Sequence, residues 1–170
     1  WSSSHDMGSP GTRNDMYVNG NIPPCITDVT YTPSLPRTNQ SISVTAVIDD
    51  NRADASSTPP ISATLYYRPR GESLYRTLTM SDDGLDGDTY AGDTVYTALI
   101  PPRSISGTMY IQPGAGTYIE FYIRAMDNEG AARIMPEGAP GHASAETGSY
   151  VTTSYLVWIE DTPPTSTLPL

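Results

Sequence analysis

Apolar residues occupy every second position of residues 41–48, and this pattern limits the possible folds more than any other feature of the chain. Ile42, Val44, Ala46 and Ile48 form the apolar series, and mostly serine and threonine stand between them. Because successive side chains of a strand point to opposite faces, a period of two predicts a strand with one buried face. Similar segments predict strands at residues 25–31, 61–68, 74–80, 94–100, 117–125, 131–135 and 149–160, with a further short one at 108–111.

No stretch shows a sustained period of 3.6 residues, so we expect no amphipathic helix. Seven or eight short strands separated by turn signals predict an all-β fold, an immunoglobulin-like antiparallel β-sandwich with extended N- and C-terminal tails. We assign residues 1–22 to a linker or the end of a preceding domain, 23–160 to the sandwich and 161–170 to a proline-rich exit linker. Because the chain opens at Trp1, we expect it to be part of a longer protein.

The charge balance excludes several classes of partner. Nine basic residues, all arginine, stand against nineteen acidic ones, which gives a net charge of −10. Nucleic acids and anionic membrane surfaces both need a positive footprint, so neither is expected as a partner. The apolar runs are too short for a membrane-inserted helix. The single cysteine, Cys25, permits neither an intramolecular disulfide nor a cysteine-based zinc site.

Residues 81–96 form the most acidic stretch of the chain. They contain three glycines, no basic residue and five aspartates, namely Asp82, Asp83, Asp86, Asp88 and Asp93. Hard cations with oxygen ligands offset such a density of carboxylates, and we therefore predict a Ca²⁺ site formed by these five residues. The alternative is a long hairpin turn between residues 74–80 and 94–100 whose aspartates cap their own backbone amides. The spacing is not that of an EF-hand loop, and the sequence leaves both interpretations open.

Two smaller acidic clusters end other strands, Asp49 and Asp50 with Asn51 in one loop, and Asp127 with Glu129 in another. They fit solvated turns, with an interdomain cation site as the alternative.

The sequence gives little support for catalysis, and we expect a protein that is not an enzyme. Its two histidines are His5, in the N-terminal linker, and His142, in a loop rich in glycine, alanine and proline. Ser144 and Glu146 follow His142, but one flexible segment without supporting residues does not make a catalytic triad.

Aromatic residues suggest a different kind of ligand. Twelve residues are tyrosine, and Tyr66, Tyr122 and Trp158 fall on the polar faces of their predicted strands. An exposed strip of rings would stack on sugars, so a carbohydrate-binding accessory module is our alternative function. The last strand, residues 149–160, could instead cover these rings.

The order of several short segments resembles bacterial immunoglobulin-like or fibronectin-III-like modules of large secreted proteins. The similar segments are residues 24–29, 44–49, 65–68, 83–101 and 122–130. The N-terminal residues 1–14 look like the end of a lamin-tail domain, and residues 167–170 look like the lead-in to a spore-coat kinase-like (CotH) domain. The resemblance implies a non-catalytic extracellular or cell-surface module that acts as a spacer or interaction domain. Its partners would be the neighbouring domains, and another protein or a glycan would be a further partner.

Overall fold

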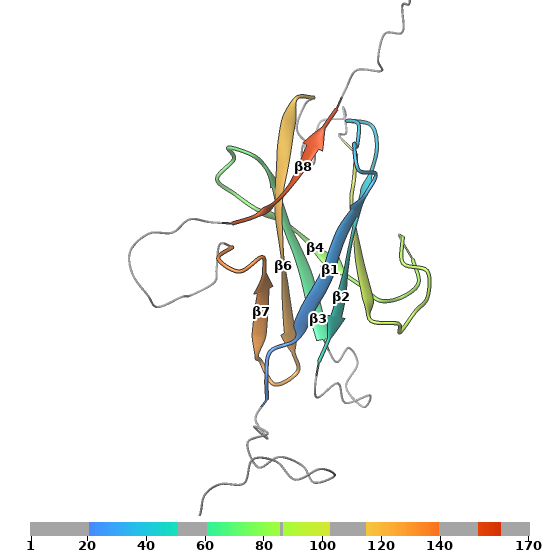
Figure 1. Cartoon of the computed structure of the whole chain (residues 1–170), viewed down its shortest axis with the longest axis vertical. Coiled ribbons are helices and arrows are strands. Elements are labelled where there is room, and N and C mark those ends of the chain that lie inside the picture. The colour runs from blue at the N-terminus through green and yellow to red at the C-terminus, as the bar shows by residue number, and fades with distance from the viewer. Residues whose placement is uncertain (1–20, 51–60, 86, 103–114, 140–152, 161–170) are drawn as a thin grey trace, which may run out of the picture.

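The computed structural model describes residues 21–50, 61–85, 87–102, 115–139 and 153–160, and this part of the chain is built from strands without a helix (Figure 1). The strands are β1 (Cys25–Thr32), β2 (Ile42–Asp49), β3 (Ile61–Pro69), β4 (Arg76–Met80), β5 (Val95–Ile100), β6 (Thr117–Asp127), β7 (Ala132–Met135) and β8 (Tyr155–Ile159). The predicted all-β fold is confirmed.

The strands form two antiparallel sheets. One has three strands in the order β1-β2-β5, and the other contains β4-β3-β6-β7 with β8 also paired to β6. β8 pairs with the first half of β6, from Thr117 to Phe121, whereas β7 pairs with the second half, from Ile123 to Met126. β7 and β8 therefore lie one after the other along the same edge of β6. The two sheets together form the predicted β-sandwich.

Alternation in the sequence corresponds to the buried faces of the sheets. Every second residue of β2, from Ile42 to Ile48, is buried, and the intervening residues are partly exposed. β3 and β6 supply the facing layer, with Leu65 and Phe121 among the side chains that water hardly reaches. The Phe121 ring also contacts two tyrosine rings of the core, those of Tyr31 and Tyr155. Burial of these apolar faces is the main force that holds the sheets together.

The turn between β6 and β7 is held by the buried carboxylate of Asp127. It accepts hydrogen bonds from the backbone N–H groups of Glu129 and Ala131 and from the side-chain amide of Asn21, at 2.8–2.9 Å. Desolvation raises the pKa of Asp127, but the hydrogen bonds outweigh it and hold the pKa below its usual value. A turn is present as predicted, but Asp127 is buried rather than solvated. Asn21 ties the segment before β1 to this turn.

Two expectations need correction. Residues 74–80 and 94–100 do not form a hairpin within one sheet, because β4 belongs to the five-stranded sheet and β5 to the three-stranded one. The acidic stretch is therefore a crossover between sheets. The last strand is also shorter than predicted, since β8 begins only at Tyr155. The expected strand at 108–111 and most of both predicted linkers lie outside the described residues.

Candidate functional site

The acidic loop, which we define as residues 81–94, crosses from β4 to β5 and stands out at one side of the sandwich (Figure 1). At its base, Ser81 and Thr97 form an antiparallel bridge with two backbone hydrogen bonds of 3.0 and 2.8 Å. This bridge joins the two sheets at the point where the loop begins and ends.

Asp82 connects the two ends of the acidic loop. Its Oδ1 accepts hydrogen bonds from the N–H groups of Gly92 at 2.6 Å and Asp93 at 3.2 Å, and its Oδ2 accepts one from Thr94 at 2.9 Å. One carboxylate thus holds three consecutive backbone amides that lie ten to twelve residues further along the chain.

Asp88 organises the middle of the loop from a buried position, with 7 % of its surface exposed. Its Oδ2 accepts a hydrogen bond from the N–H of Gly84 at 2.7 Å, and its Oδ1 accepts one from Tyr90 at 3.1 Å. Its own N–H donates to the carbonyl of Leu85 at 3.0 Å. Gly84 has a φ of 76°, which glycine adopts without strain.

Asp83 and Asp93 are exposed, and each caps a nearby amide. Asp83 accepts from the N–H of Leu85, and Asp93 accepts from the N–H of Val95, each at 3.0 Å. Such bonds two residues along the chain are typical of aspartate in turns. The capping interpretation of the acidic stretch is therefore correct for each of the four aspartates that the structure describes.

The same geometry brings three carboxylates together. One oxygen from each of Asp82, Asp88 and Asp93 lies within 4.8 Å of the others. Asp83 is exposed and is not part of this group, and Asp86 lies outside the described residues. A carboxylate offers about four lone-pair positions. The described donors occupy three on Asp82, two on Asp88 and one on Asp93, so acceptor capacity remains for a cation.

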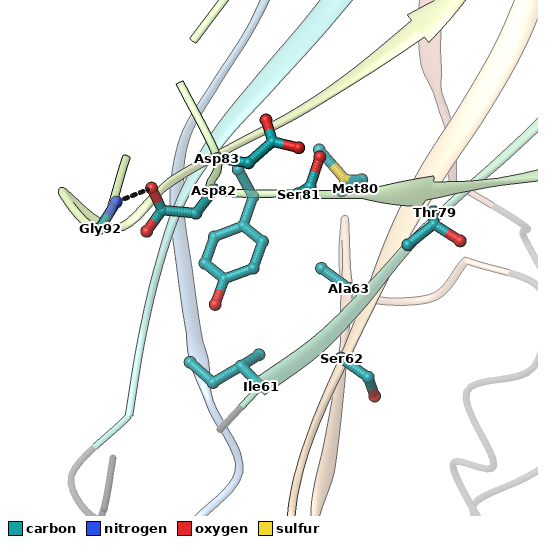
Figure 2. A pocket seen from close by; sticks show the side chains of 10 residues that line it. Ile61, Ser62, Ala63, Thr79, Met80, Ser81, Asp82, Asp83 and Gly92 are labelled. Carbon is teal, nitrogen blue, oxygen red and sulfur yellow. Dashed lines mark hydrogen bonds between the residues drawn. The ribbon is translucent and has the colours of Figure 1, made fainter. Parts of the chain in front are cut away.

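A pocket of about 460 Å³ lies beside the start of the acidic loop (Figure 2). Its apolar lining comes from Ile61, Ala63, Met80 and Tyr96. Asp82 and Asp83 lie at the end of the pocket where β4 passes into the loop, and Asp82 turns toward Gly92. Burial, and then the negative charge of Asp82, raise the pKa of Tyr96. No local sequence pattern indicates this pocket, because its walls come from separate strands of both sheets.

The predicted aromatic strip is mostly packed against itself. The rings of Tyr66 and Tyr122 stack with centroids 4.6 Å apart, and Tyr75 meets Tyr122 edge-on at 4.9 Å. Tyr122 is 7 % exposed, and burial, followed by its tyrosine neighbours, raises its pKa to about 12. Trp158 remains 37 % exposed and lies 4.8 Å from the ring of Tyr118.

The other acidic clusters do not add to the carboxylate group. Among the described residues, Asp49, Asp50 and Asp127 belong to no set of three or more potential metal ligands. The predicted loop residues His142, Ser144 and Glu146, and His5, lie outside the described residues. In the described part of the chain, no helix is long and apolar enough to cross a membrane.

Comparison with known proteins adds no relative: no protein-family model matches the chain, and the search of curated proteins gave no match.

Proposed function

We propose that this chain is a non-catalytic, extracellular immunoglobulin-like module of a multidomain bacterial protein, and that its acidic loop binds Ca²⁺. The module would act as a spacer or interaction domain between neighbouring domains. The observation behind this proposal is the convergence of Asp82, Asp88 and Asp93, whose carboxylate oxygens lie within 4.8 Å of one another. The order of strands in the two sheets also fits an immunoglobulin-like module.

A cation would offset a specific cost of this geometry. Three carboxylates at this distance repel one another, and no basic residue occurs between Arg76 and Arg103. Their backbone hydrogen bonds reduce the repulsion and also fix the direction of each carboxylate, which prepares the oxygens for a shared ion. A bound ion would stiffen the crossover between the two sheets, as a spacer module requires.

Calcium fits this loop better than magnesium. Ca²⁺ accepts six to eight oxygen ligands in flexible geometry, and backbone carbonyls and water complete its shell. Mg²⁺ demands a near-ideal octahedron and retains several waters, so it gains less from a loop with several carboxylates. Extracellular modules bind Ca²⁺ with dissociation constants of about 10⁻⁴–10⁻³ M, and we expect this range.

Calorimetric titration with CaCl₂ tests the proposal. We expect one ion per chain, and an affinity reduced about tenfold in Asp93→Asn, which loses one charged ligand. Asp93 is a suitable position because it is exposed and caps only Val95 among the described residues. Glu137→Gln is the matched control, since it removes one negative charge from an exposed side chain of another loop. Absence of binding heat, or equal affinities for Asp93→Asn and the control, would contradict the calcium site.

Carbohydrate binding remains the second candidate, and one observation favours it. The rings of Trp158 and Tyr118 meet edge-on, with centroids 4.8 Å apart, on the outer side of the five-stranded sheet. Of the three predicted rings, Tyr66, Tyr122 and Trp158, that of Trp158 is the most exposed. A ring of this kind can stack on a sugar. A glycan array probed with the wild type and with Trp158→Ala tests the idea, and a blank array for the wild type ends it.

A further inference from the structure

The pocket beside the acidic loop combines an apolar wall with a negatively charged mouth. Its volume of about 460 Å³ falls within the range of small-molecule sites, about 300–1,000 Å³. Ile61, Ala63, Met80 and Tyr96 are each no more than 8 % exposed, so their side chains offer a water-poor surface to an apolar body. The pocket thus has the size and the lining of a site for one small organic molecule.

The mouth determines the charge that such a molecule must carry. Asp82 and Asp83 are the charged residues among the described lining, and no arginine is among them (Figure 2). Both side chains are carboxylates, so the charge at this end of the pocket is negative. The ring of Tyr96 itself provides a face on which a cation is favoured. An anion would meet uncompensated repulsion here.

We propose that this pocket binds a small organic ammonium ion, with its apolar part against Ile61, Ala63 and Met80 and its charged group between Tyr96 and the carboxylates of Asp82 and Asp83. Ser62, Thr79, Ser81 and Gly92 complete the lining. This inference does not depend on the proposed calcium site, because the pocket and its charge exist without an ion in the loop.

Three probes of equal length test the proposal in calcium-free buffer: hexylammonium, hexanol and hexanoate. Two-dimensional amide NMR titrations of the wild type measure both affinity and location. We expect hexylammonium to shift the amides of Ala63, Ser81 and Tyr96 and to bind about fivefold more tightly than hexanol. Hexanoate should bind more weakly than either. Equal affinities for hexylammonium and hexanol, or shifts confined to other surfaces, would overturn the proposal.

Two variants, Asp83→Asn and Ala63→Leu, then separate the effect of the charge on binding from the effect of the pocket's shape. Asp83→Asn keeps the side-chain volume and should weaken hexylammonium about threefold while leaving hexanol unchanged. Glu137→Gln, the charge-matched control, should leave both affinities as in the wild type. Ala63→Leu should fill the pocket and remove binding of both probes. If that variant does not fold, the comparison of Asp83→Asn with Glu137→Gln decides, and identical affinities in these two would refute a role for the charged mouth.

Discussion

Replacing Asp82 by alanine tests the physical account of the acidic loop, because two opposing effects have different sizes at this position. The substitution removes three hydrogen bonds to backbone amides, at 2.6, 3.2 and 2.9 Å. At about 1 kcal/mol net for each bond, their loss would destabilise the domain by about 3 kcal/mol. The same substitution relieves repulsion with Asp88 and Asp93, whose oxygens lie within 4.8 Å.

At that separation the repulsion is about 1 kcal/mol per pair in water, and salt reduces it further. The lost hydrogen bonds therefore outweigh the relieved repulsion, and we expect Asp82→Ala to lower the free energy of unfolding by about 1–2 kcal/mol in calcium-free buffer. For a domain of this size, the melting temperature should fall by about 3–8 °C. Urea denaturation followed by tyrosine and tryptophan fluorescence measures the free energy, and circular dichroism measures the melting temperature.

Asp83→Ala is the matched control for this experiment. It removes the same charge from the neighbouring position, but Asp83 is exposed and, among the described residues, caps a single amide, that of Leu85. Its expected cost is below about 1 kcal/mol. A variant Asp82→Ala as stable as the wild type, or no less stable than Asp83→Ala, would show that the carboxylate of Asp82 does not hold the loop.

Three further predictions concern other positions. Asp127→Asn should lower the free energy of unfolding above pH 4 and change it little at lower pH. A carboxyl whose pKa is lowered by folding stabilises the protein fully above the pKa of the unfolded state, about 3.9, and this contribution is lost as pH falls. Denaturation at pH 7 and at pH 3 measures the difference. Gly87→Ala should destabilise more than Gly71→Ala, since both have positive φ but a Cβ at Gly87 would meet Ser43 Oγ at 2.5 Å; equal melting temperatures would contradict this. Ultraviolet titration of Tyr122→Phe should lack a tyrosine with a pKa of about 12 that the wild type has. The stability linked to Tyr122 should be complete below pH 10 and be lost as pH rises toward 12.

Much of the fold follows from local sequence patterns. The alternation in residues 41–48 and 117–125 predicts the inward faces of β2 and β6, because the period of a strand fixes the face of every residue. It fails at Tyr122, which lies on the other face of β6 and is buried by the rings of Tyr66 and Tyr75. The capping role of aspartates in the acidic loop also follows from local chemistry, since aspartate and glycine favour turns.

The long-range geometry was beyond local patterns. The patterns of residues 74–80 and 94–100 predict two strands but not their sheets, and the hairpin expected between them is wrong because the strands belong to different sheets. Sequence spacing also does not reveal that Asp82 reaches Gly92 and Thr94, or that Asp83 stays outside the carboxylate group. These contacts depend on the path of a crossover between two sheets, which is set by packing far from the loop.

Thermal denaturation with and without calcium tests the proposed function most directly. An ion held by Asp82, Asp88 and Asp93 binds the folded state alone and therefore raises its stability by mass action. At a calcium concentration about ten times the dissociation constant, the gain is about 1.4 kcal/mol, which corresponds to about 4 °C in melting temperature. We predict such a rise for the wild type in millimolar CaCl₂ relative to EDTA. A change of less than about 1 °C would contradict the calcium site and leave the acidic loop as a turn held by its own aspartates.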